Sequence, residues 1–168
     1  MGGDMSAYRL LYDRYSKAMY NTALRITANK ADAEDILQDS FTDAFLQLHS
    51  FENKASFGAW LKQIVVFKSV ALLKKRRLIF TGIEHETEEL AEENTPDEQE
   101  LEFTVAGIKK AMNQLPHGYR AVLSLYLLEG YDHEEIADIL QISHSTARTQ
   151  YKRGKQKLLQ LLQKEEKI

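Results

Sequence analysis

An acidic segment divides this chain into two blocks. Residues 78–102 contain ten Asp and Glu and no Lys or Arg, whereas residues 1–77 and 103–168 carry net charges of +4 and +3. Dense like charge with few aromatic residues keeps such a segment solvated. We therefore expect two folding units, residues 1–78 and 103–168, joined over residues 79–102 by an acidic flexible linker, whose simplest role is to solubilise.

Both blocks are expected to be helical. Their apolar residues recur at spacings of three and four, and no stretch sustains the two-residue alternation of a strand. Two stripes in the first block are predicted to face the core of packed helices. These stripes are Ala33, Leu37, Phe41, Ala44 and Leu48, and Phe57, Trp60, Ile64, Phe67 and Ala71. The predicted fold class is all-α, with two small helical domains.

The second block has the signals of a helix-turn-helix. Gly130 can end one helix as a left-handed residue. Asp132 followed three residues later by Glu135 indicates a capping box for a short helix, Glu134–Leu140. The three residues Gln141–Ser143 then form a turn before a basic helix. Two helices joined by so short a turn are typical of a helix-turn-helix.

The basic helix after this turn has two unlike sides. One side is expected to pack on the preceding helices, and it consists of Ala147, Tyr151, Gly154, Leu158 and Leu161. Glycine costs a helix about 1 kcal/mol relative to alanine, so close packing is the expected reason for Gly154. The other side carries Ser145, Arg148, Thr149, Lys152 and Gln156. This side could be a solvated basic face. The short turn, the helix caps and the position of the cations near the start of the helix favour DNA binding.

A carboxylate stripe is expected on a helix of the first block. Asp32, Asp35, Asp39 and Asp43 follow one another at spacings of three, four and four, so they share one helix face. A solvated acidic face and a protein-binding face both fit this pattern. A four-carboxylate metal site fits poorly, because no His shares the stripe.

Catalysis and cofactor binding have little support in the sequence. The chain has no Cys, so thiolate metal sites and disulfides are excluded, and no phosphate-binding glycine motif occurs. His49, His85, His117, His133 and His144 form no pair spaced by four. We expect no enzyme, no metal and no cofactor. No segment is apolar enough for a signal peptide or a membrane span, so a cytoplasmic location is expected.

Three segments together resemble a known family. They are "ADAEDILQDSFTDAFLQL", then "SFGAWLKQI" followed by "LLKKRR", and "LPHGYRAVLSLYLLEGYDHEEIADILQISHSTARTQYKRGKQKL". From about Tyr8 to Leu162 the chain resembles sigma factors of the extracytoplasmic-function (ECF) group. The resemblance implies a non-catalytic subunit that binds core RNA polymerase and directs promoter-specific transcription initiation. It also implies an anti-sigma factor that masks these surfaces, and a linker that runs near the RNA exit path.

The same resemblance implies three sets of site residues. The polymerase-binding set is Asp32, Glu34, Asp35, Gln38 and Asp39. The minus-10 set, for recognition and melting, is Asn53, Lys54, Ser56, Lys62, Lys74, Lys75, Arg76 and Arg77. The minus-35 set is Ser145, Thr146, Arg148, Thr149, Lys152, Arg153 and Lys155, of which Arg153 and Lys155 suit phosphates.

Three aromatic and small residues of the first block complicate the minus-10 assignment. Trp60 could stack on an unpaired base, but its place on the apolar stripe favours core packing. The family usually has Asn where Phe67 stands and often Asp where Ala71 stands. Polar contacts to DNA from these two positions are therefore absent, which bears on how the protein melts promoter DNA.

Two other functions remain open from the residues. A stand-alone helix-turn-helix regulator that binds an operator as a dimer would explain Leu115–Leu162 equally well. It would not explain the acidic helix and the basic run of the first block. A purely protein-binding helical adaptor predicts no affinity for DNA at all.

Overall fold

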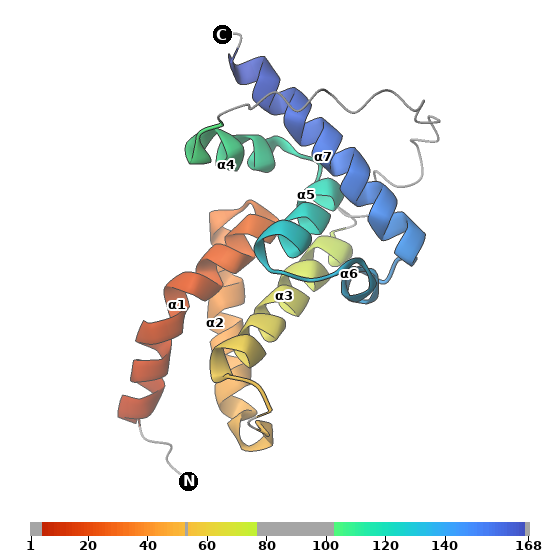
Figure 1. Ribbon diagram of the computed structural model, residues 1–168. Coiled ribbons are helices and arrows are strands. Elements are labelled where there is room, and N and C mark those ends of the chain that lie inside the picture. Colours follow the sequence, from red (N-terminus) through yellow and green to blue (C-terminus); the bar gives the residue numbers. More distant parts are fainter. Residues whose placement is uncertain (1–4, 53, 77–102, 167–168) are drawn as a thin grey trace.

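The computed structural model describes residues 5–52, 54–76 and 103–166, and these ranges are built of helices (Figure 1). The first unit contains α1 (Met5–Thr27), α2 (Lys30–Leu46), a short 3-10 turn η1 (Leu48–Ser50) and α3 (Phe57–Lys75). The second contains α4 (Val105–Gln114), α5 (His117–Leu123), the π-helical turn η2 (Ser124–Leu128), α6 (His133–Leu140) and α7 (His144–Glu166). The described residues include no strand, which confirms the all-α prediction. None of these helices is long and apolar enough to cross a membrane.

The first unit is a three-helix bundle with capped helix starts. Asn29 accepts a hydrogen bond from the Asp32 amide at 3.0 Å and starts α2, and Ser56 does the same for Ala59 at 3.2 Å at the start of α3. The apolar stripe predicted for α2 is confirmed as far as Ala44. Its buried members are Ala33, Leu37, Phe41 and Ala44.

The apolar stripe predicted for α3 is partly wrong. Phe67 is 55% exposed and Ala71 is exposed, while Phe57, Trp60 and Ile64 are only half-buried. The fully buried residues of α3 are Leu61, Val65, Val66, Ser69, Val70 and Leu73. The reason is that α3 packs on two partners, α1 and α2 on one side and the second unit on another, so its buried face is turned away from the predicted stripe.

The second unit confirms the predicted helix-turn-helix. The Asp132 carboxylate accepts from the Glu135 amide at 2.8 Å, and Glu135 accepts from the Asp132 amide at 2.9 Å, completing the capping box of α6. Gly130 has a φ of 81°, as its place after a helix required. Gln141 also takes a left-handed backbone, with a φ of 55°, and begins the turn that ends at Ser143.

The apolar side of α7 packs as predicted. Ala147 and Gly154 are buried, and a Cβ at position 154 would lie 3.3 Å from side-chain atoms of Tyr119 and Leu123. The glycine thus allows α7 to approach α5 closely. Gln150, which the sequence pattern did not single out, is also buried.

The two units also share a hydrophobic core. Residues of α1 and α3 contact residues of α5, η2 and α6 in one continuous cluster, and Figure 1 shows α5 and α6 against the first unit. From the first unit the cluster takes Ile26, Val66, Val70 and Leu73, and from the second Ala121, Val122, Leu125, Ile136, Ala137, Ile139, Leu140 and Ala147. The units therefore pack against each other through apolar side chains.

Arg120 lies buried at the junction of the units, with 2% of its surface exposed. Its guanidinium donates to three backbone carbonyls, those of Leu115 at 3.0 Å and of Ile26 and Thr27 at 3.4 Å. The last two belong to the end of α1, where carbonyls lack helical partners and a cation is favourable. Nη2 of Arg120, which also donates to Thr27, lies 2.5 Å from Nδ1 of His117, so His117 must be neutral to accept this second hydrogen bond.

This geometry predicts a loss of stability in mild acid. Burial, and then the charge of Arg120, lower the pKa of His117. Since that pKa lies below the unfolded value of about 6.5, the unfolded chain binds more protons as the pH falls through this value, and folding becomes less favourable. The free energy of unfolding in urea should therefore decrease between about pH 7.5 and 5.5. His117→Gln should reduce this dependence of the free energy of unfolding on pH.

A double variant provides the control, because burial also lowers the pKa of His133. If His117→Gln, His133→Gln unfolds with the same pH dependence as the wild type, the explanation is contradicted.

A second prediction concerns the contact of α7 with α5. Gly154→Leu should destabilise the fold by about 1–3 kcal/mol, because its side chain overlaps Leu123 and Tyr119. The control is Gln160→Leu at an exposed position of the same helix, for which a change within about 0.5 kcal/mol is expected. Equal effects of the two substitutions in urea unfolding would show that α7 does not need close approach.

Candidate nucleic-acid and polymerase interface

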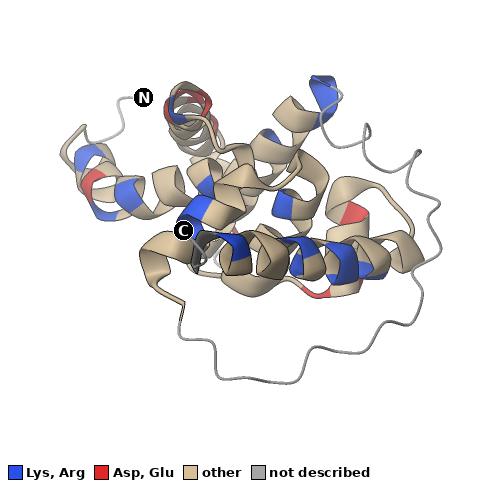
Figure 2. Ribbon diagram, turned by 90° about the horizontal axis from the view of Figure 1, so that it is seen from above, with Lys and Arg blue, Asp and Glu red and all other residues tan. Residues whose placement is uncertain are grey.

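Most of the residues predicted to bind the minus-35 element lie on the outer face of α7, whereas Thr146 and Arg153 are half-buried. Ser145, Arg148, Thr149 and Lys152 are all exposed, and Figure 2 shows Lys and Arg along this helix. Lys155 is exposed as well and lies 5.6 Å from the centre of the Tyr151 ring. The predicted face therefore presents hydroxyl and cationic groups to solvent.

The helix cap orders the start of this face. Ser143 Oγ accepts from the Thr146 amide at 3.1 Å and lies within hydrogen-bond distance of the hydroxyls of Ser145 and Thr146, at 2.9 and 2.7 Å. Thr149 donates its hydroxyl to the Ser145 carbonyl at 2.9 Å. Thr146 is half-buried. The hydroxyls at the start of α7 are thus engaged within the helix, whereas the side chains of Arg148 and Lys152 are exposed.

An aromatic and imidazole cluster holds α6 against α7. His133 stacks on Tyr126 with ring centres 4.6 Å apart and meets Tyr151 edge-on at 5.1 Å. Burial lowers the pKa of His133, and the nearby charges of His144 and Arg148 lower it further. The cluster supports the helix from which Arg148 projects. Sequence spacing did not indicate it, because its rings come from η2, α6 and α7.

The acidic residues of α2 do not form one uniform stripe. Asp32 is buried and accepts two hydrogen bonds from Arg76, at 2.5 and 2.9 Å, and Asp43 pairs with Lys68 at 2.7 Å. The remaining members of the polymerase-binding set are exposed, and they are Glu34, Asp35, Gln38 and Asp39. Within the described ranges, no three His, Cys, Asp or Glu side chains gather as metal ligands would.

The ion pair between Asp32 and Arg76 joins two of the predicted sets. Asp32 was assigned to polymerase binding and Arg76 to minus-10 DNA, yet in this structure their side chains bond to each other. The bidentate geometry fixes the start of α2 against the end of α3. Asp32 is thereby covered, whereas the side chain of Arg76 remains 47% exposed while it makes this pair.

The loop before α3 surrounds a hollow of about 280 Å³ beside Trp60. Phe51 lies 5.1 Å and Phe57 5.8 Å from Trp60 between ring centres, so the indole is packed in an aromatic group, as its place on the stripe favoured. Lys54 is exposed and pairs with Glu52. The hydroxyl of Ser56 is already used to cap α3.

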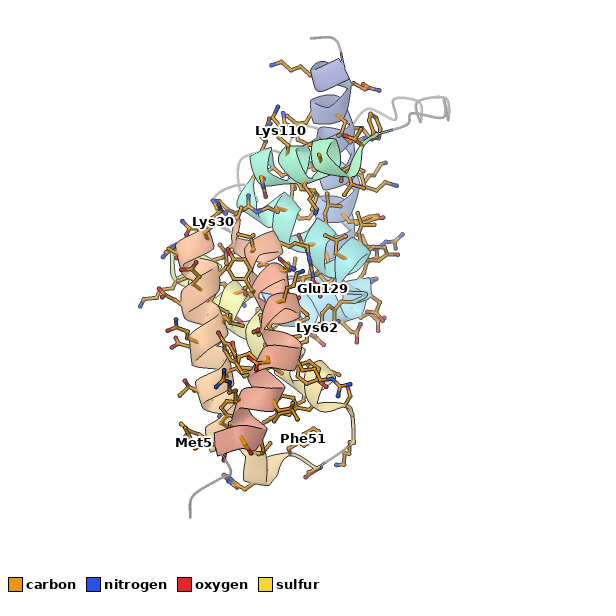
Figure 3. All side chains as sticks on the ribbon, turned by 90° about the vertical axis from the view of Figure 1, so that its left-hand side faces the viewer. Met5, Lys30, Phe51, Lys62, Lys110 and Glu129 are labelled. Carbon is orange, nitrogen blue, oxygen red and sulfur yellow. The ribbon has the colours of Figure 1, made fainter. Side chains whose placement is uncertain are left out.

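The cations of α3 that are predicted to bind minus-10 DNA have different surroundings. Lys75 is exposed, whereas Lys62 and Lys74 both contact the second unit. Lys62 Nζ donates to the Glu129 carbonyl at 3.1 Å, and Figure 3 shows the two residues close together. Two further members of the set, Asn53 and Arg77, lie outside the described residues, as do residues 79–102 of the expected linker.

The two positions that differ from the family pattern form an apolar surface. Phe67 and Ala71 line, with Trp60 and Ile64, a shallow hollow of about 440 Å³ that Asp43 and Lys68 border. The polar side chains of α3 that line this hollow are Gln63 and Lys68.

Comparison with known proteins identifies both units. Residues 11–79 match the family model for sigma-70 region 2, and residues 106–158 match that for sigma-70, region 4. Together the two matches span most of the chain and occur in the order of the two helical units.

Relatives of similar length show the same relationship. The ECF RNA polymerase sigma factor SigW of Bacillus subtilis is 25% identical, over 93% of this chain and 89% of its own. SigX of the same organism is 28% identical, over 88% and 79%. Among solved structures, the sigma factor RpoE in complex with the anti-sigma factor NepR from Bartonella quintana superposes with a TM-score of 0.60 and 23% identity, over 95% of this chain and 98% of that one. The helix-turn-helix with its exposed cations, the acidic helix and both family matches therefore place this chain in the sigma-70 family, as a sigma factor of the ECF group.

Proposed function

We propose that this sigma factor uses two oppositely charged surfaces for two different binding functions. The main support is that the carboxylate face of α2 and the cationic face of α7 are both exposed and lie on different units (Figure 2). Polymerase binding is assigned to the first face and minus-35 recognition to the second. A stand-alone regulator has no use for the α2 face.

The α7 face suits a DNA major groove. Arg148 and Lys152 lie in the first half of the helix, where side chains of a recognition helix meet base edges. Arg153 and Lys155 lie further along, where phosphates pass, and contacts of this kind position the protein without reading sequence. Ser145, Thr146 and Thr149 complete the surface with hydroxyl groups.

The α2 face suits a basic partner surface. The first three turns of the helix expose Glu34, Asp35, Gln38 and Asp39. Asp32 lies on the same helix and fixes its start through the pair with Arg76. Carboxylates arranged in this way steer association with a positively charged partner. We assign them to the clamp helices of core RNA polymerase.

The minus-10 role is assigned to the loop before α3 and to the cations of α3. The hollow beside Trp60 and the exposed Lys54 offer an aromatic wall and a cation, the two groups that hold an unpaired base and its phosphate. Lys62, Lys74, Lys75 and Arg76 extend the cationic track. Phe67 gives this track an apolar stretch that family members with Asn lack.

In this scheme the chain itself is not catalytic. RNA synthesis belongs to the polymerase, and the sigma factor acts in the cytoplasm, where it selects and opens promoters. RpoE of Bartonella quintana was solved with an anti-sigma factor, and we propose that a protein of this kind also regulates this chain.

Capture of bacterial core RNA polymerase tests the α2 assignment. The double variant Asp35→Ala, Asp39→Ala should weaken one-to-one capture by at least about tenfold, since it removes two carboxylates that meet cations. The matched control is Glu134→Ala, Asp138→Ala on exposed positions of α6, which should bind as the wild type does. Absence of any capture, with duplex DNA binding intact, would favour the stand-alone regulator.

Duplex binding tests the α7 assignment. A preferred duplex is first selected from a random library with the wild-type chain. Arg148→Ala should then lose about 1–3 kcal/mol of binding free energy on the selected duplex and little on a random one. Lys155→Ala should weaken binding to both duplexes alike. The slope of the logarithm of the binding constant against the logarithm of the salt concentration should fall by about one, the value for one phosphate contact. Equal losses on both duplexes for Arg148→Ala would remove Arg148 from base recognition.

A further inference from the structure

An exposed aromatic ring lies in the middle of α3. Phe67 is 55% exposed and belongs to none of the three apolar clusters of the described residues. Ala71, one turn later, is exposed as well. Together with the half-buried Trp60 and Ile64, these residues line the hollow of about 440 Å³. The hollow therefore presents aromatic and aliphatic groups to solvent.

This hollow adjoins the one beside the loop before α3. Trp60 and Gln63 line both hollows, so these two side chains form their common border. Gln63 is exposed, and its amide can both donate and accept hydrogen bonds with the edge of a base. The two hollows thus form one continuous surface that runs from the loop onto α3.

The spacing along this surface suits a strand whose bases are unstacked. Phe67 lies four residues, about 6 Å along the helix axis, beyond Gln63 at the common border. Successive bases in one strand of a duplex are only about 3.4 Å apart. A strand that offers neighbouring bases to both hollows must therefore be drawn out of its stack, as it is in melted DNA.

The charges around Phe67 favour a base over a phosphate in this hollow. Lys68 borders the hollow, and its Nζ pairs with the Asp43 carboxylate at 2.7 Å, which leaves this border without net charge. A phosphate placed there would have to approach the carboxylate of Asp43. A base is flat and uncharged, so it can stack on the phenyl ring without that repulsion. Lys75, two turns beyond Phe67, is exposed and suits the phosphates of the same strand.

We propose that Phe67 forms a second base site, in which its ring stacks on the unpaired base next to the one held in the loop hollow. The phenyl ring has no hydrogen-bonding group, so it holds a base by stacking alone. Stacking of this kind tolerates any of the four bases, because every base has a π-face. The site rests on the minus-10 function proposed above, to which it adds a residue that stacks on DNA.

Binding of a single strand by the complex of this chain with bacterial core RNA polymerase tests the site. The probe is a short fluorescent strand of mixed sequence, and core polymerase alone gives the background. Phe67→Ala and Phe67→Leu should each bind it at least about fivefold more weakly than the wild type, because both lack a ring. Phe67→Trp should bind at least as tightly as the wild type, since the indole offers a larger face. The control is Leu10→Ala, at a 70% exposed apolar position of α1, which should not change binding.

A strand of the same length without bases separates stacking from phosphate binding. The wild type and Phe67→Ala should bind this abasic strand equally, because it has no base to stack. Lys75→Ala should weaken binding to both strands, as the loss of a phosphate contact does. Weaker binding of Phe67→Ala than of the wild type to the abasic strand would overturn the proposal.

The same measurements distinguish failure of this site from failure of the minus-10 function. If Lys54→Ala weakens binding to the mixed strand and Phe67→Ala does not, the minus-10 function stands and the second base site is wrong. If the wild-type complex does not bind the strand, the minus-10 function is wrong, and the second base site with it. Weaker capture of core polymerase by Phe67→Ala would assign the hollow to the polymerase and not to DNA. Because Phe67 is exposed, its variants should unfold at the same urea concentration as the wild type.

Discussion

The buried guanidinium of Arg120 is the constraint around which the two units are arranged. No carboxylate among the described residues pairs with it, and it donates instead to the carbonyls of Leu115, Ile26 and Thr27 and to His117. A buried cation without these acceptors would be costly, so the end of α1 must stay where Arg120 can reach it. Around this fixed point the shared apolar core forms, and Glu129 comes to face Arg25 and Lys62.

The same packing gives the two proposed DNA surfaces different availability. The contact of α7 with α5 through Gly154 leaves its opposite face toward solvent, so duplex recognition needs no rearrangement. Two cations of α3, Lys62 and Lys74, by contrast, make hydrogen bonds to the second unit. Polar pairs at such an interface exchange readily for contacts with water or phosphate, whereas apolar contacts do not.

Charge that looks uniform along the sequence is partitioned by the fold. Of the four aspartates spaced along α2, Asp32 and Asp43 pair with cations of the first unit, which leaves Asp35 and Asp39 for a partner. The cations at the end of α3 also differ from one another. Arg76, which follows the helix, pairs with Asp32, whereas the side chain of Lys75 is exposed to solvent. Residue type and spacing identify candidates for binding, and neighbouring helices decide which of them remain free.

The sequence by itself determined the local features of this protein. Helical periodicity gave the all-α class, the Asp132 and Glu135 box gave α6, and the pattern of α7 separated its buried side from its cationic face, since each of these depends on residues within a few turns. Only the tertiary structure decided that Phe67 is exposed, that Arg120 and Glu129 are buried, and that Lys62 and Lys74 face the second unit. These contacts join residues some 65 to 107 positions apart, and no periodicity within one helix records which distant surface will cover it.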